Sequence, residues 1–356
     1  MQRSIFKATT PNGRYCTVSI NINNALGSGG YATVYAGKAV DSQEDLAIKL
    51  ITVKNQFDWE HCEKELDIMT SLTSPNAKYI MQLYGYFNDD DYTCIVMSRA
   101  ANGVLSDWLT GIKPGLLPQQ QIEVMYGIAY GLAYMHSKNI LHCDIKPANI
   151  LLDARMQPML CDFGLSMRES IDSTNGVAGT LFYFAPELLL AAKAKLCSMQ
   201  ANGKFPYTKQ TDIYSFSLLC YCIMAKKGKP FNHISMVGNF EADLNALSDW
   251  VVDKNERDII PDQPQCPQHV AEMIDLGWSA DPEKRPTAVQ ALERLRDETN
   301  ENMPKFPNSH YNTMHTVYKP KPPKKEDIDI VDGKVMAVKI NKEGYKSRCR
   351  CQCSLF

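Results

Sequence analysis

The feature that most constrains the fold of this sequence is a change of pattern near residue 105. Before that point, residues 14–53 alternate β-branched and aromatic side chains around glycine-rich turns, which predicts antiparallel strands. After it, apolar residues recur at helical spacing, as in residues 121–138 and 212–226. Strands followed by helices predict an α+β protein with two lobes.

The strand-rich part also contains one helical pattern. Residues 57–72 carry apolar side chains at helical spacing, and two further strand-like runs, residues 80–87 and 92–98, follow it. We therefore expect the first lobe to be a small antiparallel sheet with one helix, and the second lobe to be mainly helical.

Composition excludes several classes of protein. Of the 356 residues, 44% are hydrophobic and 22% charged, which is ordinary for a globular chain, and a net charge of −2 gives no reason to expect nucleic acid as a partner. No apolar run approaches the roughly 18–20 residues of a membrane span, and the N-terminus shows no secretory signal pattern. There is no CxxC pair among the 12 cysteines, so we expect no structural zinc site.

The first candidate site is the segment Leu26–Val34, LGSGGYATV, which lies between two strand patterns. Glycines there let the backbone fold closely over a ligand whose phosphates meet amide N–H groups, although a plain hairpin turn has the same sequence character. Lys49 follows inside an apolar strand, where its charge requires an anionic partner. The next helix offers Glu60, Glu63 and Glu65.

A second candidate site is the loop in ILHCDIKPANILLD, which brings Asp144, Lys146 and Asn149 close together between apolar runs. A carboxylate can accept a proton from a hydroxyl, a lysine can neutralise a phosphate, and an amide oxygen can bind magnesium. Asp162, beside a Phe-Gly step in MLCDFGLS, suits a second magnesium ligand. Each motif alone is compatible with a surface loop, but their order along one chain is not expected by chance.

Together these motifs resemble those of the eukaryotic-type protein kinases over roughly residues 20–300, nearest to the tyrosine-kinase-like group of serine/threonine kinases. The resemblance implies a two-lobed kinase fold with ATP and Mg²⁺ as cofactors. It divides the chain into an N-terminal extension (1–19), an N-lobe (about 20–98), a C-lobe (about 99–300), a Pro/Lys linker (301–326) and a basic tail (327–356).

The resemblance also implies roles for individual residues. Asp144 is the expected catalytic base and Lys146 the phosphate-facing lysine, with Asn149 and Asp162 as magnesium ligands. The spacing of the apolar residues that follow it selects Glu65 over Glu60 and Glu63 as the partner of Lys49. The ATP-binding residues are then Leu26, Gly27, Gly29, Val34, Ala47, Lys49, Glu65 and Met97, and Ala32 stands where a third glycine is usual. Met97 is either the gatekeeper of the adenine pocket or a plain core residue.

Three further matches are structural. Glu187 in the APE motif is expected to pair with Arg285, and Asp212 is expected to brace the catalytic loop from the following helix. Ser217 stands where that helix usually has a glycine. About 24 residues separate Glu187 from Asp212, and this longer stretch is either a docking surface or a tolerated loop.

Two features indicate the acceptor. The motif D-I-K-P-A-N places lysine two residues after Asp144, as in serine/threonine kinases, and Thr180 in GTLFYFAPE is also of that type. We therefore expect phosphorylation of Ser/Thr in a protein substrate. Two alternatives stay open: a kinase-fold scaffold without catalysis, and a kinase with a non-protein acceptor.

Cys143 is the most informative departure from the family. Most regulated kinases carry arginine there, and it binds a phosphorylated residue of the activation segment, an ion pair that cysteine cannot form. We hypothesise that activity does not require phosphorylation of this segment, although Ser170, Ser173 and Thr174 are available.

The tail has its own signals. Residues 301–356 carry eleven Lys/Arg against six Asp/Glu, and Asp332-Gly333 between two apolar runs predicts a hairpin. Cys353-Ser-Leu-Phe resembles a prenylation box, and Cys349 and Cys351 are candidates for palmitoylation. One lipid chain holds a protein weakly, so the basic residues would add attraction to anionic lipid. We expect attachment to the cytosolic face of a membrane, in a eukaryotic cell or in the host of a bacterium, with an inert tail as the alternative.

Overall fold

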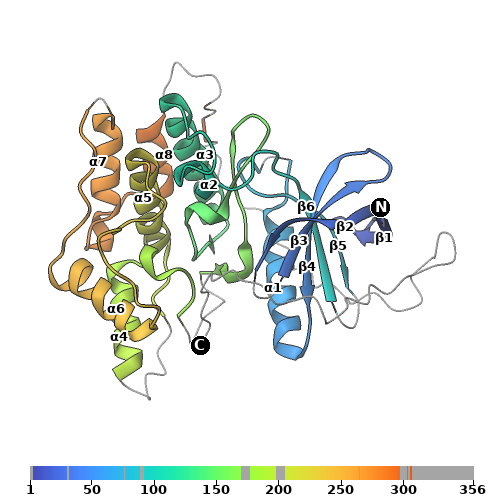
Figure 1. The fold of residues 1–356 in the computed structure, drawn as a ribbon, viewed down its shortest axis with the longest axis horizontal. Helices are drawn as coiled ribbons and strands as arrows, with labels where there is room; N and C mark the ends of the chain where they lie inside the picture. The colour runs from blue at the N-terminus through green and yellow to red at the C-terminus, as the bar shows by residue number, and fades with distance from the viewer. Residues whose placement is uncertain are drawn as a thin grey trace. The chain divides into compact units, whose positions relative to one another are not determined.

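The computed structural model describes residues 3–29, 32–75, 77–88, 92–169, 177–197, 205–263, 265–296, 303 and 305–306 (Figure 1). These residues form two compact units. Of the described residues, those up to Thr73 and Gln82–Arg99 form the first unit, and Ser74–Met81 and those from Ala100 onward form the second. Strands dominate the first unit and helices the second, so the α+β class is confirmed.

The first unit is a closed antiparallel barrel in the order β1-β2-β3-β4-β6-β5. Its strands are β1 (Arg3–Thr9), β2 (Tyr15–Ser28), β3 (Ala32–Ala39), β4 (Asp45–Thr52), β5 (Leu83–Asn88) and β6 (Tyr92–Ser98). The expected strand over residues 80–87 begins later, at Leu83, because Ile80 pairs with Leu160 in the second unit.

Strand β1 was not predicted from the sequence, where residues 1–19 were expected to form an N-terminal extension. It pairs with β2 from Arg3↔Asn21 to Thr9↔Tyr15, and Thr9 also pairs with Tyr86 of β5. The available signal was Asn12-Gly13, a strong hairpin dipeptide, and Gly13 has the positive φ of 78° that such turns need.

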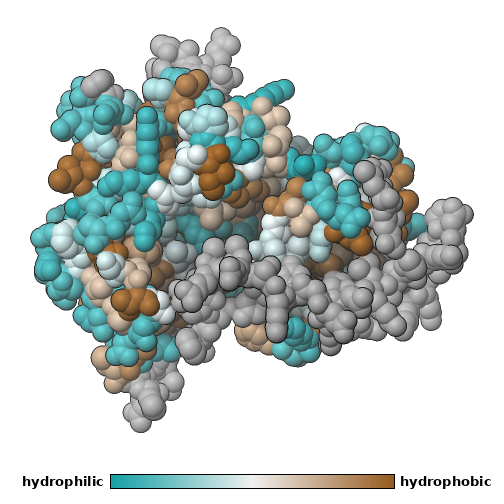
Figure 2. All heavy atoms as spheres, in the orientation of Figure 1, coloured by the Kyte–Doolittle hydropathy of each residue, from teal (hydrophilic) through white to brown (hydrophobic). Residues whose placement is uncertain are grey.

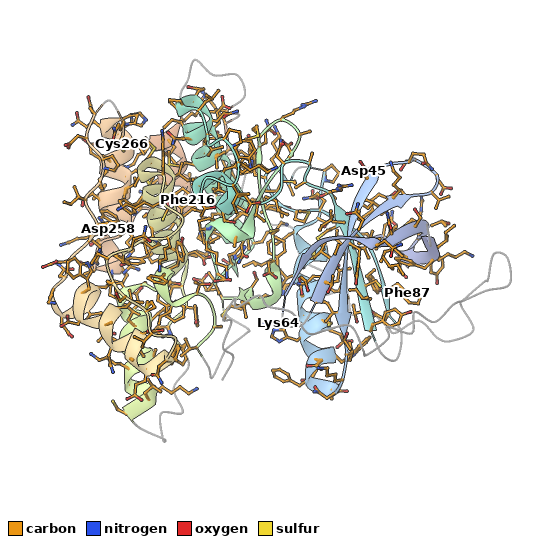
Figure 3. All side chains as sticks on the ribbon, in the orientation of Figure 1. Asp45, Lys64, Phe87, Phe216, Asp258 and Cys266 are labelled. Atoms are coloured by element: carbon orange, nitrogen blue, oxygen red, sulfur yellow. The ribbon has the colours of Figure 1, made fainter. Side chains whose placement is uncertain are left out.

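The barrel interior explains why β1 belongs to the unit. Phe87 of β5, labelled in Figure 3, packs its ring against Phe6 at 5.7 Å and Tyr92 at 6.1 Å between centroids. Together with the part-buried Phe6, apolar side chains of five strands form one buried cluster: Ala8, Val18, Ile20, Ala39, Leu46, Ile48, Cys94 and Val96. Removing β1 would expose this cluster to water.

Helix α1 (Gln56–Leu72) matches the helix expected over residues 57–72. Its start is fixed by reciprocal capping, because the Asn55 side chain accepts the N–H of Asp58 at 2.9 Å and the Asp58 carboxylate accepts the N–H of Lys54 at 2.9 Å. Its buried face is Cys62, Glu65, Leu66, Ile68, Met69 and Leu72.

The second unit is built from helices α2 (Leu105–Leu109), α3 (Pro118–Ser137), α4 (Pro186–Cys197), α5 (Lys209–Ala225), α6 (Phe240–Ser248), α7 (Gln268–Gly277) and α8 (Ala288–Leu295). Helix α3 packs against α5 and α8, and α5 packs against α7 (Figure 1). Phe216 of α5, labelled in Figure 3, is fully buried among these helices. The exposed face of this unit in Figure 2 is mostly hydrophilic. Among the described residues, no helix is long and apolar enough to cross a bilayer.

The loops between these helices contain short strands and single helical turns. Strand β7 (Ile140–Leu141) pairs with β10 (Met167–Arg168), and β8 (Ile150–Leu152) pairs with β9 (Pro158–Leu160). Single helical turns occupy Pro147–Asn149, Phe163–Leu165, Leu181–Tyr183, Asp249–Asp253 and Pro282–Lys284.

The structure accounts for serine at position 217. The Ser217 hydroxyl donates to the carbonyl of Ile213 one turn earlier, at 2.9 Å, so its polar atom is satisfied inside a buried helix. Space for this side chain comes from Gly277 of α7, where an added Cβ would lie only 1.9 Å from the Ser217 oxygen. At this contact between α5 and α7, the glycine that makes room lies on α7.

The close contact between Gly277 and Ser217 predicts that Gly277→Ala destabilises the protein by about 1–3 kcal/mol through overpacking. Adding Ser217→Gly should restore most of the loss, because the new methyl group then fills the vacated space. Chemical denaturation of the two single variants and the double variant measures the coupling. Additive free energies of unfolding would contradict the prediction.

Candidate active site

Lys49 and Glu65 form an ion pair inside the first unit. Lys49 lies on β4 opposite Val34 of β3, and its ammonium is 2.7 Å and 3.0 Å from the two carboxylate oxygens of Glu65 on α1. The exposed fractions are 18% for the Lys49 side chain and 6% for that of Glu65, so the pair is largely shielded from water. Glu60 is exposed and accepts from Gln56 instead.

The strand register gathers the other expected nucleotide-binding residues on one face of the sheet. Gly27 lies opposite Val34, and Ala47 lies opposite Met97. Because facing residues project to the same side, and residues two apart on a strand share a side, Val34, Ala47, Lys49 and Met97 share the face that carries Glu65. Leu26 is 42% exposed, and the N–H of Gly29 donates to the carbonyl of Ala32 at 2.9 Å.

In the second unit, Asp144, Lys146 and Thr180 form a compact triangle. The Lys146 ammonium is 2.7 Å from a carboxylate oxygen of Asp144 and donates to the Thr180 hydroxyl at 2.7 Å. The hydroxyl in turn donates to the other oxygen of Asp144 at 2.8 Å. A hydroxyl held between a carboxylate and an ammonium has a defined direction for its proton, which is the arrangement that general-base chemistry requires.

Asp212 at the start of α5 holds the loop that carries Asp144. Its two carboxylate oxygens accept the backbone N–H groups of His142 and Cys143, both at 2.9 Å, and one of them lies 2.9 Å from Nε2 of His136. Burial raises the pKa of Asp212, but hydrogen bonds and electrostatic interactions with His136 and His142 together outweigh burial and leave the pKa below its usual value. These hydrogen bonds to Asp212 keep Cys143 at a φ of 65°, a conformation that a non-glycine residue rarely adopts.

Asn149 and Asp162 are brought together by the β8–β9 hairpin. Ile150 pairs with Leu160, and the N–H of Cys161 donates to the carbonyl of Asn149 at 3.0 Å, so Asp162 follows directly. The Asn149 amide nitrogen donates to the Asp144 carbonyl and carboxylate, both at 2.8 Å, which turns its side-chain oxygen the other way. An amide oxygen and an exposed carboxylate are hard ligands that fit Mg²⁺.

The Phe-Gly step after Asp162 is anchored in the same unit. Phe163 is 1% exposed, and its ring centre lies 5.6 Å from that of His142. Nε2 of His142 lies 3.2 Å from the carbonyl oxygen of Cys161, and Asp162 itself has a φ of 63°. Strained backbone held by this much packing is common at catalytic centres.

The residue that sequence reasoning missed is Tyr207. Its hydroxyl donates to the carbonyl of Ala178 at 2.5 Å and accepts the N–H of the same residue at 2.9 Å, so it fixes the chain just before Thr180. Burial raises the pKa of Tyr207, which keeps the phenol neutral. Tyr207 lies in the long stretch between Glu187 and Asp212 that the sequence offered only as docking surface or loop.

Cys143 lines a small cavity together with Thr180, Tyr207 and Asp212. Among the described residues that line this cavity there is no lysine or arginine. Next to it, Gly179 has a φ of 109°, and a Cβ there would lie 2.7 Å from the Cys143 carbonyl oxygen. A phosphate group in this cavity would therefore have no cationic side chain among these lining residues to bind.

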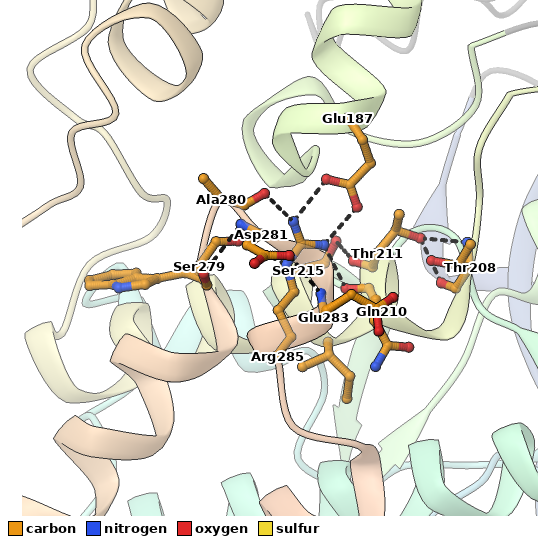
Figure 4. Close-up of polar contacts among 12 residues, drawn as sticks. Glu187, Thr208, Gln210, Thr211, Ser215, Ser279, Ala280, Asp281, Glu283 and Arg285 are labelled. Carbon is orange, nitrogen blue, oxygen red and sulfur yellow. Dashed lines mark hydrogen bonds and ion pairs between the residues drawn. The ribbon is translucent and has the colours of Figure 1, made fainter.

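Arg285 and Glu187 form the expected structural pair. Two guanidinium nitrogens of Arg285 lie 2.7 Å and 2.8 Å from the two carboxylate oxygens of Glu187, and the Arg285 side chain is fully buried (Figure 4). It also donates to the carbonyls of Gln210 at 3.0 Å and Ser279 at 2.9 Å. A bidentate pair with further hydrogen bonds satisfies the buried charge.

Comparison with known proteins agrees with this geometry. The family model described as "Protein kinase domain" matches residues 20–295. The chain is 28% identical over 278 residues to the dual specificity protein kinase shkB of Dictyostelium discoideum, covering 77% of this chain and 39% of that protein. It is 29% identical over 222 residues to the Aurora kinase of Patiria pectinifera, covering 61% and 50%, and 30% identical over 239 residues to the Aurora/IPL1-related protein kinase 2 of Caenorhabditis briggsae, covering 65% and 73%.

Because the family model covers more than half of the sequence, the chain belongs to the protein kinase family. The first two of these matches span half or less of the relatives' own lengths. The tail cysteines Cys349, Cys351 and Cys353, the expected hairpin around Asp332 and the phosphorylatable Ser170, Ser173 and Thr174 lie outside the described residues.

Proposed function

We propose that this chain is a serine/threonine protein kinase that transfers the γ-phosphoryl group of ATP to hydroxyl groups of proteins. The observation that carries the proposal is the Thr180 hydroxyl held between the carboxylate of Asp144 and the ammonium of Lys146. A substrate hydroxyl entering the same site would meet the same two groups. The two compact units are then the two lobes of the kinase fold.

Each side chain has a separate task in this mechanism. Asp144 orients the attacking hydroxyl and accepts its proton, while Lys146 stabilises negative charge on the transferring phosphoryl group. Asn149 and Asp162 would hold magnesium, whose charge offsets that of the phosphates when it is bound. In the first unit, Glu65 fixes the ammonium of Lys49 in the orientation needed to bind nucleotide phosphates.

The transfer assay tests the proposal directly. With magnesium, ATP and a generic protein acceptor, the wild-type chain should form phosphoserine or phosphothreonine. Asp144→Asn should lower kcat on the order of a thousandfold, because the proton acceptor is lost while the shape is kept. Asp249→Asn, which changes an exposed aspartate paired with Lys254, is the matched control and should leave kcat unchanged.

Other outcomes of this assay identify the alternatives. Binding of ATP without any transfer would favour a kinase-fold scaffold, and transfer only to lipid or small-molecule hydroxyls would favour a non-protein acceptor. Phosphotyrosine beside phosphoserine would indicate dual specificity, the activity named for the Dictyostelium relative.

We further propose that the active arrangement forms without phosphorylation of the activation segment. The support is the lack of a basic side chain among the described residues that line the cavity beside Cys143, and the anchoring of Ala178 by Tyr207. The triple variant Ser170→Ala, Ser173→Ala, Thr174→Ala should keep kcat/KM within about threefold of wild type. Loss of a charge-assisted hydrogen bond that the active arrangement needed would lower kcat/KM by more than this. A loss of a hundredfold or more in the same assay would overturn this view.

For the tail, we propose attachment to a membrane through lipid chains on its cysteines and through its basic residues. Lys342, Lys346, Arg348 and Arg350 surround Cys349, Cys351 and Cys353, which supplies the two signals that stable attachment requires. The full chain expressed in a eukaryotic cell should sediment with membranes, and the variant with all three cysteines changed to serine should remain in the supernatant. Equal distribution of the two proteins would favour an inert tail.

A further inference from the structure

The loop after α5 places a lysine against the segment that follows Thr180. This segment forms the single turn Leu181–Tyr183, and the ammonium of Lys229 lies 4.3 Å from the centre of the Phe182 ring. Phe182 and Lys229 are both part-exposed, so this cation lies beside the surface on which an acceptor peptide would rest. Contact with an aromatic face holds a cation in place without cancelling its charge.

The charge of Lys229 is not offset by a carboxylate. Among the described residues, neither Lys229 nor its exposed neighbour Lys226 forms an ion pair. Lys227 differs, because its ammonium donates to the Tyr221 hydroxyl at 2.6 Å, and Tyr221 is also hydrogen-bonded to Asp258. Lys226 and Lys229 are therefore the two cations of this turn that are open to a partner.

The carboxylates near this surface are already engaged. Asp144 is bound by Lys146 and Thr180, Glu187 by Arg285, and Asp212 by His136 and two backbone N–H groups. In the catalytic loop, the exposed residue between Lys146 and Asn149 is Ala148, which is neutral. None of these groups leaves an unpaired negative charge beside the acceptor position.

Resting on the proposed kinase function, we infer that Lys229 selects substrates whose phosphorylated Ser or Thr is flanked within a few residues by Asp or Glu. Thr180, which touches Asp144, is only two residues from Phe182, so a peptide residue near the acceptor reaches the Lys229 ammonium. Complementary charge lowers the KM of acidic peptides, and like charge excludes basic ones. The chain's own basic tail, with eleven Lys/Arg against six Asp/Glu, has the wrong sign to occupy this surface.

The test uses three peptides with one serine and the same length, flanked by Glu, by Ala or by Arg. Wild type should give a kcat/KM for the Glu peptide at least about tenfold above that for the Arg peptide, mainly through KM, and rising salt should shrink the ratio. Lys229→Glu should reduce the ratio about tenfold or invert it while the Ala peptide keeps its kcat. Lys195→Glu is the matched control. Lys195 lies on α4, and its ammonium is also close to a phenylalanine ring, 5.5 Å from the centre of the Phe205 ring.

Peptide binding without ATP, measured by fluorescence anisotropy of the same labelled peptides, separates this inference from the proposed function. If no peptide is phosphorylated but the Glu peptide still binds more tightly than the Arg peptide in a manner that depends on Lys229, the charge preference stands and the kinase activity does not. Equal affinities for the Glu and Arg peptides, or a Lys229→Glu variant with an unchanged ratio, would overturn the inference.

Discussion

The buried carboxylate of Asp212 is the constraint on which the second unit depends. A buried carboxylate is costly unless its lone pairs are filled, and here two backbone N–H groups and His136 fill them. The N–H groups can reach the carboxylate only if the chain turns sharply at Cys143, which has a φ of 65°. The hydrogen bonds to Asp212 therefore offset the free-energy cost of that turn, and Asp144 follows directly after it.

Helix α5 also positions the segment that faces Asp144. The Ser215 hydroxyl donates to the carbonyl of Tyr183 at 2.7 Å, and the Tyr183 hydroxyl lies 3.9 Å from the Cys222 sulfur. Arg285 connects the carbonyl of Gln210 on this helix to Glu187 after the segment. The loop that carries Asp144 and the segment that carries Thr180 are thus both fixed to one buried helix, so their spacing is set by a rigid element and not by two independent loops.

Motifs with fixed spacing were predictable from the sequence because their chemistry is local. The strand residue Lys49 needed an anion, and the resemblance of the apolar spacing after Glu65 to the family pattern selected the partner that lies 2.7 Å away. Asp144, Lys146 and Asn149 were expected together because they share one short loop. The extent of helix α1 could also be read from its apolar spacing and agreed to one residue.

Contacts between distant segments were not predictable in the same way. Nothing in the local pattern shows that Tyr207 reaches Ala178, or that Gly277 makes room for Ser217, since both depend on how helices and loops pack in three dimensions. Strand β1 is a different case, because Asn12-Gly13 signals a hairpin, but the pairing of Thr9 with Tyr86 follows only from barrel closure.

Barrel closure has a consequence for how the first unit meets other chains. A sheet with two free edges offers unpaired N–H and C=O groups to any extended segment, whether a binding partner or another copy in an aggregate. In this unit every strand has a neighbour on both sides, and the seam between β1 and β5 is joined at a single residue pair. A strand added along β1 or β5 would therefore compete with that pair, whereas β3, β4 and β6 are paired on both sides and offer only side chains to a partner.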